Sequence, residues 1–464
     1  MPLNSITSLF RDKRIALLGF GREGRAMLRF IRRELPGKEV YIADANPFLN
    51  EDPSLREIPG IQLQAGPDYL EGLHAFDLVI KTPGIPHSLL NGKVSPQNIT
   101  TQTDLFLRRF APQVTGITGT KGKSTTSSLI SHLLKSAGKD TVLLGNIGIP
   151  AFDLWDHIGP HTHIVFELSS HQLEDIHISP HIALLLNIFE EHLDHYPSFE
   201  AYQQAKLNIA RFQQSGDYFV FHSENPVLRE AVAGNGEFPG RRHSYTLCRH
   251  PGSSAYWRGN DLVVVMDGRE VLLSAPQLPG LPGDHNRLNI AAACLAAMLN
   301  GLGPEEIISA LPGFQPLPHR MEYVGCLGNI HFYNDSIATI PEATMAAVKS
   351  LGKVDTLIAG GHNRGIHYGG LVDFLLQSGI SLVLLTGEVG NLLLEGLQKG
   401  GFSGKAEWDA QFENLVKRAV SCTPHGGVCL LSPAASSYDA FRNFEERGDL
   451  YKNLVKDYFA SLTP

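Results

Sequence analysis

Residues 119–125 have the types and the spacing of a loop that binds phosphate. They read Gly-Thr-Lys-Gly-Lys-Ser-Thr. Glycine lets the backbone curl tightly enough to point N–H groups at phosphate oxygens, and the dipole of a following helix favours negative charge. Lys123 then reaches the outer phosphates, and Ser124 can hold a magnesium ion. The loop is two residues shorter than the generic Walker A motif, because Ile117 stands where that motif has its first glycine. The binding mechanism survives this shortening; the alternative is a glycine turn beside a solvated lysine.

This loop needs a strand before it and a helix after it. Alternating β-branched residues predict the strand over 114–118, and the apolar residues of 129–134 fall on one face of the helix. A neighbouring strand is expected over 163–168, with Glu167 near its end. A carboxylate in this place, beside a phosphate loop, can act as a magnesium ligand of the Walker B kind. In isolation the same acid would be a helix cap or an ion-pair partner.

Acidic residues and histidines follow the next predicted strand, 182–187. The segment 190–195 reads Glu-Glu-His-Leu-Asp-His and could bind a second metal ion through oxygen and imidazole. A helix is then expected over 198–212, with Lys206 on its half-buried face. We interpret Lys206 from its position alone as a lysine whose aliphatic stem lies along the protein while its ammonium reaches solvent.

The N-terminal part has a second glycine-rich turn. A buried strand over 14–18 leads into Gly19-Phe20-Gly21-Arg22-Glu23-Gly24 and a helix, and a second strand ends at Asp44. This is the fingerprint of a dinucleotide-binding fold, in which Asp44 could accept a hydrogen bond from a ribose or a base. A further strand over 77–81 ends in the rigid turn Thr82-Pro83-Gly84-Ile85-Pro86, where ligands of such folds bind.

Two features could complete a nucleotide site from later in the chain. Asn286 and Asn289 lie three apart on one helical face and could bind an adenine or ribose edge, although helix capping explains them nearly as well. Arg320 follows a proline-rich junction, 311–318, which we expect to be a hinge. A lone cation there would normally be a surface charge. Beyond a hinge it could instead move onto phosphates when domains close.

The C-terminal part alternates strands with helices. Four strands are expected to run into polar loops, and they are 329–333, 356–359, 382–385 and 428–431. The first of them ends at Asn334-Asp335-Ser336. Such alternation predicts another parallel α/β sheet with its polar loops at the carboxyl edge.

Length and composition set the class of protein. At 464 residues the chain is too long for one core, and we predict an α/β protein with three domains, 1–102, 103–316 and 317–464. The polar stretch 98–104 is the expected linker. A net charge of −8 argues against a general nucleic-acid binder and against a membrane-surface protein, and no segment predicts a signal peptide or a membrane span. The five cysteines, without a CxxC pair, predict reduced core residues of a cytoplasmic protein.

The ordered set of motifs resembles the Mur ligases over nearly the whole chain. The resemblance rests on residues 118–125, Gly145-Asn146-Ile147-Gly148, Glu167-Leu168-Ser169-Ser170, His192-Leu193-Asp194-His195-Tyr196, Ala205-Lys206-Leu207, His285-Asn286, Pro318-His319-Arg320, Asn334-Asp335-Ser336, Ser432-Pro433-Ala434 and 441–448. It implies a Rossmann-like UDP-binding domain, a central P-loop ATPase-like domain and a C-terminal Rossmann-like domain.

The resemblance also implies an activity. It is ATP-dependent ligation of glutamate, D-glutamate by default, to UDP-N-acetylmuramoyl-L-alanine through an acyl phosphate, in the peptidoglycan synthesis on which cell shape and division depend. Ile337 and Ile340 stand where the related glutamate ligases have lysine and asparagine, and Arg364 lies near where a lysine meets the side-chain carboxylate. L-glutamate therefore stays open as the added amino acid. So does the group that deprotonates its amine.

The roles that the resemblance implies fall into four groups. ATP would be bound by Gly119, Thr120, Lys121, Gly122, Lys123, Ser124, Thr125, Asn286, Asn289, Arg320 and Asp335. Two magnesium ions would be held by Ser124, Glu167, His192 and Lys206, the lysine being carbamylated by CO2. The UDP-linked substrate would meet Gly21, Arg22, Asp44, Thr82, Gly84, Asn146, Ser169 and His192. The amino acid would be framed by Thr339, Arg364, Ser437, Tyr438 and Phe444. Catalysis would rest on Lys123, His192 and Lys206.

Two other classes of function remain as alternatives. A nicotinamide-dependent oxidoreductase would explain the turn at 19–24 and Asp44, but it would leave Lys123 and Ser124 without a role. A nucleotide sensor that has lost turnover would have no need to retain Glu167 and Lys206 together.

Overall fold

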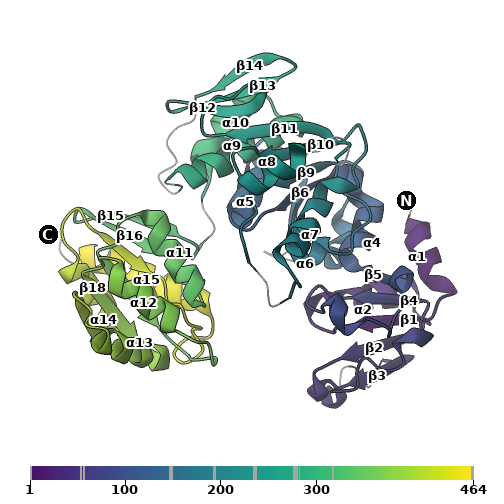
Figure 1. Cartoon of the computed structure of the whole chain (residues 1–464), viewed down its shortest axis with the longest axis horizontal. Helices are drawn as coiled ribbons and strands as arrows, with labels where there is room; N and C mark the ends of the chain where they lie inside the picture. The colour runs from purple at the N-terminus through teal and green to yellow at the C-terminus, as the bar shows by residue number, and fades with distance from the viewer. Residues whose placement is uncertain are drawn as a thin grey trace. The chain divides into compact units, whose positions relative to one another are not determined.

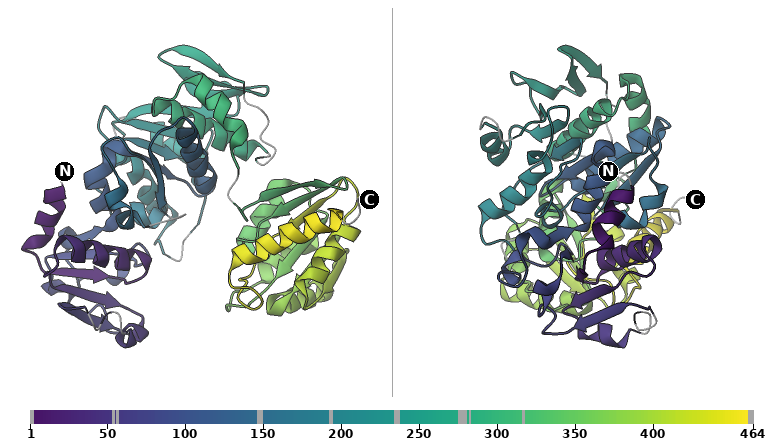
Figure 2. Two further views of the ribbon diagram at one scale, coloured as in Figure 1. Left: turned by 180° about the vertical axis from the view of Figure 1, so that it is seen from behind. Right: turned by 90° about the vertical axis from the view of Figure 1, so that its right-hand side faces the viewer.

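The computed structural model describes residues 3–52, 55, 58–145, 150–191, 195–233, 238–274, 281, 283–315 and 318–460. Contacts between residues divide the chain into two compact units (Figures 1 and 2). The first comprises Met1–Gln277 and Asp284–Phe314, and the second comprises Leu278–Gly283 and Gln315–Pro464. The division thus falls inside the proline-rich junction at 311–318. The three-domain boundaries, and the hinge, stay predictions.

The first sheet of the first unit is entirely parallel. Its five strands are ordered β3-β2-β1-β4-β5. They are β1 (Ile15–Leu18), β2 (Val40–Asp44), β3 (Ile61–Ala65), β4 (Leu78–Lys81) and β5 (Ile99–Thr101). The associated helices are α1 (Leu3–Arg11) and α2 (Arg22–Glu34). The strands β1 and β4 are buried at every position, which is why their sequences are apolar apart from Lys81 at the end of β4.

The polar stretch predicted as a linker, 98–104, is instead part of the fold. It forms β5 and the start of α4 (Gln102–Phe110). Thr101 caps this helix by accepting from the Asp104 N–H at 3.1 Å, and the buried Asp104 accepts from Thr100 Oγ1 at 3.2 Å and from the His177 N–H at 2.8 Å. The linker prediction is wrong because these polar groups satisfy one another in the interior rather than meeting solvent.

The second sheet has nine strands in the order β14-β13-β12-β11-β10-β9-β6-β8-β7. Its parallel strands are β6 (Val114–Thr118), β7 (Thr141–Gly145), β8 (His163–Glu167), β9 (Ile182–Leu185), β10 (Tyr218–His222) and β11 (Arg241–Thr246). An extension at one edge consists of β12 (Ser253–Arg258), which is parallel to β11, and the antiparallel β13 (Asp261–Met266) and β14 (Arg269–Leu273). The helices are α5 (Lys123–Ser136), α6 (Ser170–Leu173), α7 (Phe199–Arg211), α8 (Pro226–Ala233), α9 (Asp284–Leu299) and α10 (Pro304–Ala310).

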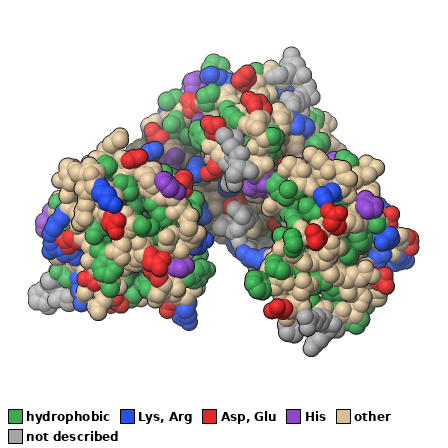
Figure 3. All heavy atoms as spheres, turned by 60° about the horizontal axis from the view of Figure 1, so that its bottom comes forward, with side chains coloured by type: hydrophobic (Ala, Val, Ile, Leu, Met, Phe, Trp, Pro, Cys, Tyr) green, Lys and Arg blue, Asp and Glu red, His purple; other side chains and the backbone are tan. Residues whose placement is uncertain are grey.

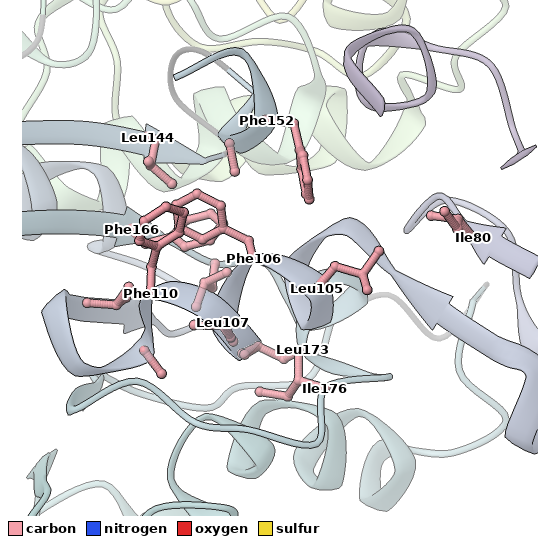
Figure 4. Packing of buried hydrophobic residues seen from close by; sticks show 14 of the residues in the cluster. Ile80, Leu105, Phe106, Leu107, Phe110, Leu144, Phe152, Phe166, Leu173 and Ile176 are labelled. Carbon is pink, nitrogen blue, oxygen red and sulfur yellow. The ribbon is translucent and has the colours of Figure 1, made fainter. Parts of the chain in front are cut away.

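One buried cluster runs from the first sheet into the second. Phe30 of α2 packs on Phe152 and Trp155, with ring centroids 4.8 and 4.9 Å apart. Phe106 of α4 meets Phe166 of β8 edge to face at 5.6 Å, as the close view of Figure 4 shows from the same cluster. Such aromatic pairs bury large apolar areas, so they hold the loops of the two sheets in a fixed relation within this unit.

The second unit contains a six-stranded sheet in the order β15-β16-β20-β17-β18-β19. The strands are β15 (Glu322–Leu327), β16 (Ile330–Asn334), β17 (Thr356–Gly360), β18 (Leu382–Thr386), β19 (Lys405–Trp408) and β20 (Val428–Leu431). The helices are α11 (Pro341–Leu351), α12 (Gly369–Gln377), α13 (Gly387–Lys399), α14 (Phe412–Cys422) and α15 (Phe444–Ala460). Within the described part of this sheet, β15 and β16 pair antiparallel and the other neighbouring strands pair parallel. The predicted α/β class is confirmed.

Surface charge, membrane-spanning segments and cysteine burial were also predicted from the sequence. Among the described side chains on the face in Figure 3, acidic and basic groups are interspersed. Within the described residues no helix is long and apolar enough to cross a membrane. All five cysteines are free, but the expectation that all belong to the core is wrong, because Cys248, Cys326 and Cys422 are exposed.

Candidate functional site

The phosphate loop leaves the central part of the second sheet. β6 pairs with β8 on one side and with β9 on the other, and it delivers Gly119, Thr120 and Lys121 into the loop. Gly122 then caps α5 with φ +88°, where a Cβ would lie 2.4 Å from the Asn289 Oδ1 of α9. Only glycine fits this conformation and this contact without strain. The first turn of α5, with Lys123, Ser124 and Thr125, has N–H groups that point past the helix N-terminus.

Backbone and side-chain contacts hold this loop in shape. The Lys123 Nζ donates to the carbonyls of Gly119 and Thr120 at 2.9 and 3.1 Å. Asn187, just beyond β9, accepts from the Thr120 N–H through its carbonyl at 2.9 Å and from the Lys121 N–H through its Oδ1 at 2.8 Å. The sequence reading missed Asn187, because it lies far from the loop along the chain. These contacts preorganise the loop for an anion at the start of α5.

Lys206 is buried and contacts the phosphate loop. Its side chain is only 2% exposed, and its Nζ donates to the Gly119 carbonyl at 3.0 Å and lies 4.9 Å from the ring centre of Tyr202. Burial, followed by the repulsion of Lys123, lowers the pKa of Lys206 well below its usual value. The interpretation of Lys206 as a solvent-reaching lysine is therefore wrong. A buried lysine of lowered pKa is more often a neutral amine, the form that reacts with CO2.

Glu167 ends β8 beside the loop. β8 pairs with β6 so that Glu167 is opposite Ile117, and the carboxylate is 1% exposed. The Ser127 Oγ lies 2.8 Å from the Lys123 carbonyl oxygen and 3.4 Å from Glu167 Oε2, which places Glu167 close to the first turn of α5. Hydroxyl and carboxylate oxygens are ligands that magnesium prefers, so Ser124 and Glu167 fit such an ion. His192, the remaining candidate ligand, lies outside the described residues, as does Asn146.

A pocket of about 340 Å³ opens between the loops of the two sheets. It is lined by Glu23, Pro83, Lys123, Ser169, Ser170, His171, Gln172, Glu191, Tyr202 and Lys206. Ser169 caps α6 in a capping box with Gln172, whose Nε2 donates to Glu23 Oε1 at 3.0 Å. Burial raises the pKa of Glu23, and this hydrogen bond from Gln172 opposes the rise. The pocket therefore joins a first-sheet glycine turn to the phosphate loop; neither Glu23 nor Gln172 was predicted as a site residue.

The predicted uridine-end residues lie at the carboxyl edge of the first sheet. Asp44 accepts from the Phe20 N–H at 2.6 Å and from the Asn46 N–H at 2.7 Å, so its carboxylate fixes the glycine turn. Gly21 and Arg22, at the start of α2, are both exposed. The Thr82 N–H donates to the Leu18 carbonyl at 2.8 Å, and a Cβ on Gly84 would meet nothing within 4 Å. The turn therefore has room for a ligand beside Gly84.

Asn286 and Asn289 lie together in α9, as their spacing predicted. The Asn289 Nδ2 donates to the Asn286 Oδ1 at 3.1 Å, and both side chains are buried. Because Asn289 also contacts Gly122, α9 is part of the wall of the phosphate loop.

The candidate residues of the second unit gather at the carboxyl edge of its own sheet. Asp335 accepts from the Met321 N–H at 3.1 Å and from Ser432 Oγ at 2.9 Å, and burial raises its pKa to about 7. The Thr339 carbonyl accepts from Arg364 at 3.3 Å. Arg320 and Tyr438 are exposed, Ser437 is buried, and the Phe444 carbonyl accepts from Ser336 Oγ at 2.8 Å.

A buried arginine, missed as a site residue, ties these loops together. Arg447 of α15 is 2% exposed. Its Nε donates to Ser336 Oγ at 3.0 Å, and its Nη2 donates to the carbonyls of Ser336 and Ala435 at 2.9 and 3.2 Å. The planar guanidinium thus fixes the loop after β16 relative to the loop after β20.

The chain is similar to known proteins over nearly its full length. The family model described as "Mur ligase middle domain" matches residues 117–297. A protein of Symbiobacterium thermophilum is 33% identical over 452 residues, which are 96% of this chain and 98% of that protein. One of Geobacillus kaustophilus is 35% identical over 457 residues, 97% and 98% of the two chains. Both are called UDP-N-acetylmuramoylalanine--D-glutamate ligase.

Solved structures share the fold at lower identity. The MurF ligase of Thermotoga maritima in complex with ADP has a TM-score of 0.55 at 16% identity and covers 97% of each chain. The UDP-N-acetylmuramate-alanine ligase MurC of Thermotoga maritima has a TM-score of 0.52 at 20% identity and covers 97% of this chain and 100% of that one. The sequence relatives, at 33% and 35% identity over nearly the full length, show that the chain belongs to the Mur ligase family.

Proposed function

We propose that this protein is an ATP-dependent ligase that adds D-glutamate to UDP-N-acetylmuramoyl-L-alanine, a step of peptidoglycan synthesis in the cytoplasm. The observation that carries the proposal is the pocket that Lys123, Lys206 and the helix-capping Ser169 line together with the glycine-turn residue Glu23. A substrate carboxylate in this pocket would lie beside the phosphate loop, which would hold ATP, and beside the glycine turn of the first sheet, which would hold the UDP-linked acceptor. The relatives that share nearly the full length favour D-glutamate over L-glutamate and leave the oxidoreductase and sensor alternatives without support.

The chemistry starts from a poor acyl donor. The carboxylate of the acceptor's L-alanine resists attack at carbon because it is negatively charged. One of its oxygens takes the γ-phosphoryl group of ATP, which gives an acyl phosphate and ADP. The amine of glutamate then attacks the acyl carbon, and phosphate leaves with the original carboxylate oxygen. Such transfer depends on positioning and on charge neutralisation.

The residues take roles that match their surroundings. Lys123 and the N–H groups at the start of α5 bind the outer phosphates, and Asn286 and Asn289 border the nucleotide. Asp44, Thr82 and Gly84 hold the uridine end. Arg320 and Asp335 would also bind ATP, and Thr339, Arg364, Ser437, Tyr438 and Phe444 would frame the glutamate.

Magnesium neutralises the charge that develops on the transferring phosphoryl group. We propose two ions, one held by Ser124 and Glu167 and another by His192 and carbamylated Lys206. In the carbamylation the neutral amine nitrogen bonds to the carbon of CO2, one C=O electron pair moves to oxygen, and the nitrogen releases a proton. The lowered pKa of Lys206 supports this step, because it supplies the neutral amine.

The test measures phosphate release and the product mass. Purified protein receives ATP and magnesium with UDP-N-acetylmuramoyl-L-alanine, and either D- or L-glutamate. The proposal expects phosphate release only with acceptor and D-glutamate together, and a product heavier by one glutamyl residue. Release without acceptor would refute it, and a product formed only with L-glutamate would reassign the amino acid. NADH binding detected by fluorescence transfer would instead support the oxidoreductase.

A further inference from the structure

A buried lysine of the first sheet connects two parts of the pocket wall. Lys81 is the last residue of β4, and its side chain is 0% exposed. Its Nζ lies 3.0 Å from Asp175 Oδ2 and 3.6 Å from Glu174 Oε2, two carboxylates that directly follow α6 of the second sheet. A buried ammonium without counter-charges is strongly disfavoured. The position of Lys81 therefore depends on the end of α6, and the end of α6 depends on Lys81.

The same ammonium fixes the turn that follows β4. Its Nζ donates to the Ile85 carbonyl at 3.0 Å, and the Ile85 N–H donates to the Thr82 carbonyl at 3.3 Å. The turn closed by these bonds contains Pro83, which lines the pocket, and Gly84, which borders open space. Lys81 thus determines the shape of the turn as well as its attachment to α6.

Two histidines complete the cluster around these carboxylates. The His87 Nε2 hydrogen bonds with Asp175 Oδ1, and the His195 Nε2 lies 3.5 Å from Glu174 Oε2. Ligand atoms of His87, Glu174 and Asp175 lie within 4.8 Å of one another, an arrangement that could hold a metal ion. The Lys81 ammonium already supplies the positive charge at this place. The cluster is therefore a connection between the β4 turn and α6.

We propose that Lys81 is a positioning residue for the UDP-linked acceptor. This inference rests on the proposed function. The β4 turn would hold the uridine end, and the pocket is lined by Gln172 of α6 and by Ser169, the residue that caps this helix. Without the ammonium the turn and α6 can shift independently, so the acceptor must order its own site on binding. ATP binds at the loop after β6, which Lys81 does not contact. Loss of the Lys81 ammonium should therefore raise the KM for the acceptor and leave the KM for ATP unchanged.

The test compares Lys81→Met, Lys81→Arg and a matched control. Methionine keeps the length of the aliphatic stem without the charge. The control is Lys93→Met, which breaks an exposed pair of the same lobe, Lys93 Nζ to Glu71 Oε1 at 2.6 Å, with no link to α6. We expect Lys81→Met to raise the acceptor KM at least tenfold, with the ATP KM and kcat within threefold of wild type. Lys81→Arg should recover part of the loss, and Lys93→Met should leave all three constants within twofold.

Asp175→Asn provides a second variant if Lys81→Met does not fold. It removes the closer counter-charge at constant shape and should raise the acceptor KM in the same selective way. The inference is overturned if the folded variants keep a wild-type acceptor KM, or if the KM values for acceptor and ATP rise together. These outcomes are separate from failure of the proposed function, in which the wild-type protein itself would form no product.

Discussion

Gly122→Ala tests how tightly the phosphate loop is built. Alanine at φ +88° costs about 1–2 kcal/mol in backbone strain. Its Cβ would also lie 2.4 Å from Asn289 Oδ1, so the buried Asn289 amide must turn away and lose its 3.1 Å hydrogen bond to Asn286. That loss is worth about 0.5–1.5 kcal/mol. We expect the free energy of unfolding to fall by about 1.5–3.5 kcal/mol, which is both losses together, and the KM for ATP to rise at least tenfold.

The matched control is Gly138→Ala at the other end of α5. Gly138 also has a positive φ, +73°, but its Cβ would meet nothing within 4 Å. This variant should show only the strain, about 1–2 kcal/mol, with an unchanged KM for ATP. Urea unfolding and steady-state kinetics measure both effects. If Gly122→Ala loses no more stability or ATP affinity than Gly138→Ala, the contact with Asn289 has no energetic role and the reasoning fails.

Two further predictions concern buried ionisable groups. Lys206→Met should lower kcat at least 100-fold. It should leave the free energy of unfolding within about 1 kcal/mol of wild type, because the lost hydrogen bond is offset by removal of a desolvated amine. Lys135→Met, at an exposed position, is the control, and normal turnover of Lys206→Met would exclude the carbamate. Asp335 has a pKa raised to about 7 by burial, so the folded state binds its proton more tightly than the unfolded state, and its contribution to stability is lost as pH rises from about 4 to 7. Asp335→Asn should flatten that part of the stability profile measured by urea unfolding, and an unchanged slope would contradict the assignment.

The sequence predicted the elements that rest on local patterns. A β-branched strand, two glycines and an amphipathic helix were enough for the phosphate loop, and parallel topology put Glu167 beside it. The burial of individual side chains was harder to predict. Helical periodicity showed which face carries Lys206 but not that this face is fully covered, so the lysine was taken for one that reaches solvent.

Specific side-chain contacts between loops distant along the chain were not predicted. Lys81 ends a strand of the first sheet and Asp175 follows α6, and nothing in either local sequence indicates the other. The same holds for Asn187, whose amide shapes the loop from the end of another strand. The segment 98–104 was predicted as a linker because its residues are polar. Polar composition alone does not distinguish groups that meet solvent from groups that hydrogen bond with one another in the interior, as the buried Asp104 does with Thr100.

The acyl phosphate is tested most directly by isotope transfer. UDP-N-acetylmuramoyl-L-alanine is prepared with oxygen-18 in the alanine carboxylate and turned over with ATP, magnesium and D-glutamate, and the released phosphate is analysed by mass spectrometry. We expect each phosphate to carry one oxygen atom from that carboxylate. Phosphate without the label, released while product forms, would contradict phosphoryl transfer to the acceptor and with it the proposed mechanism.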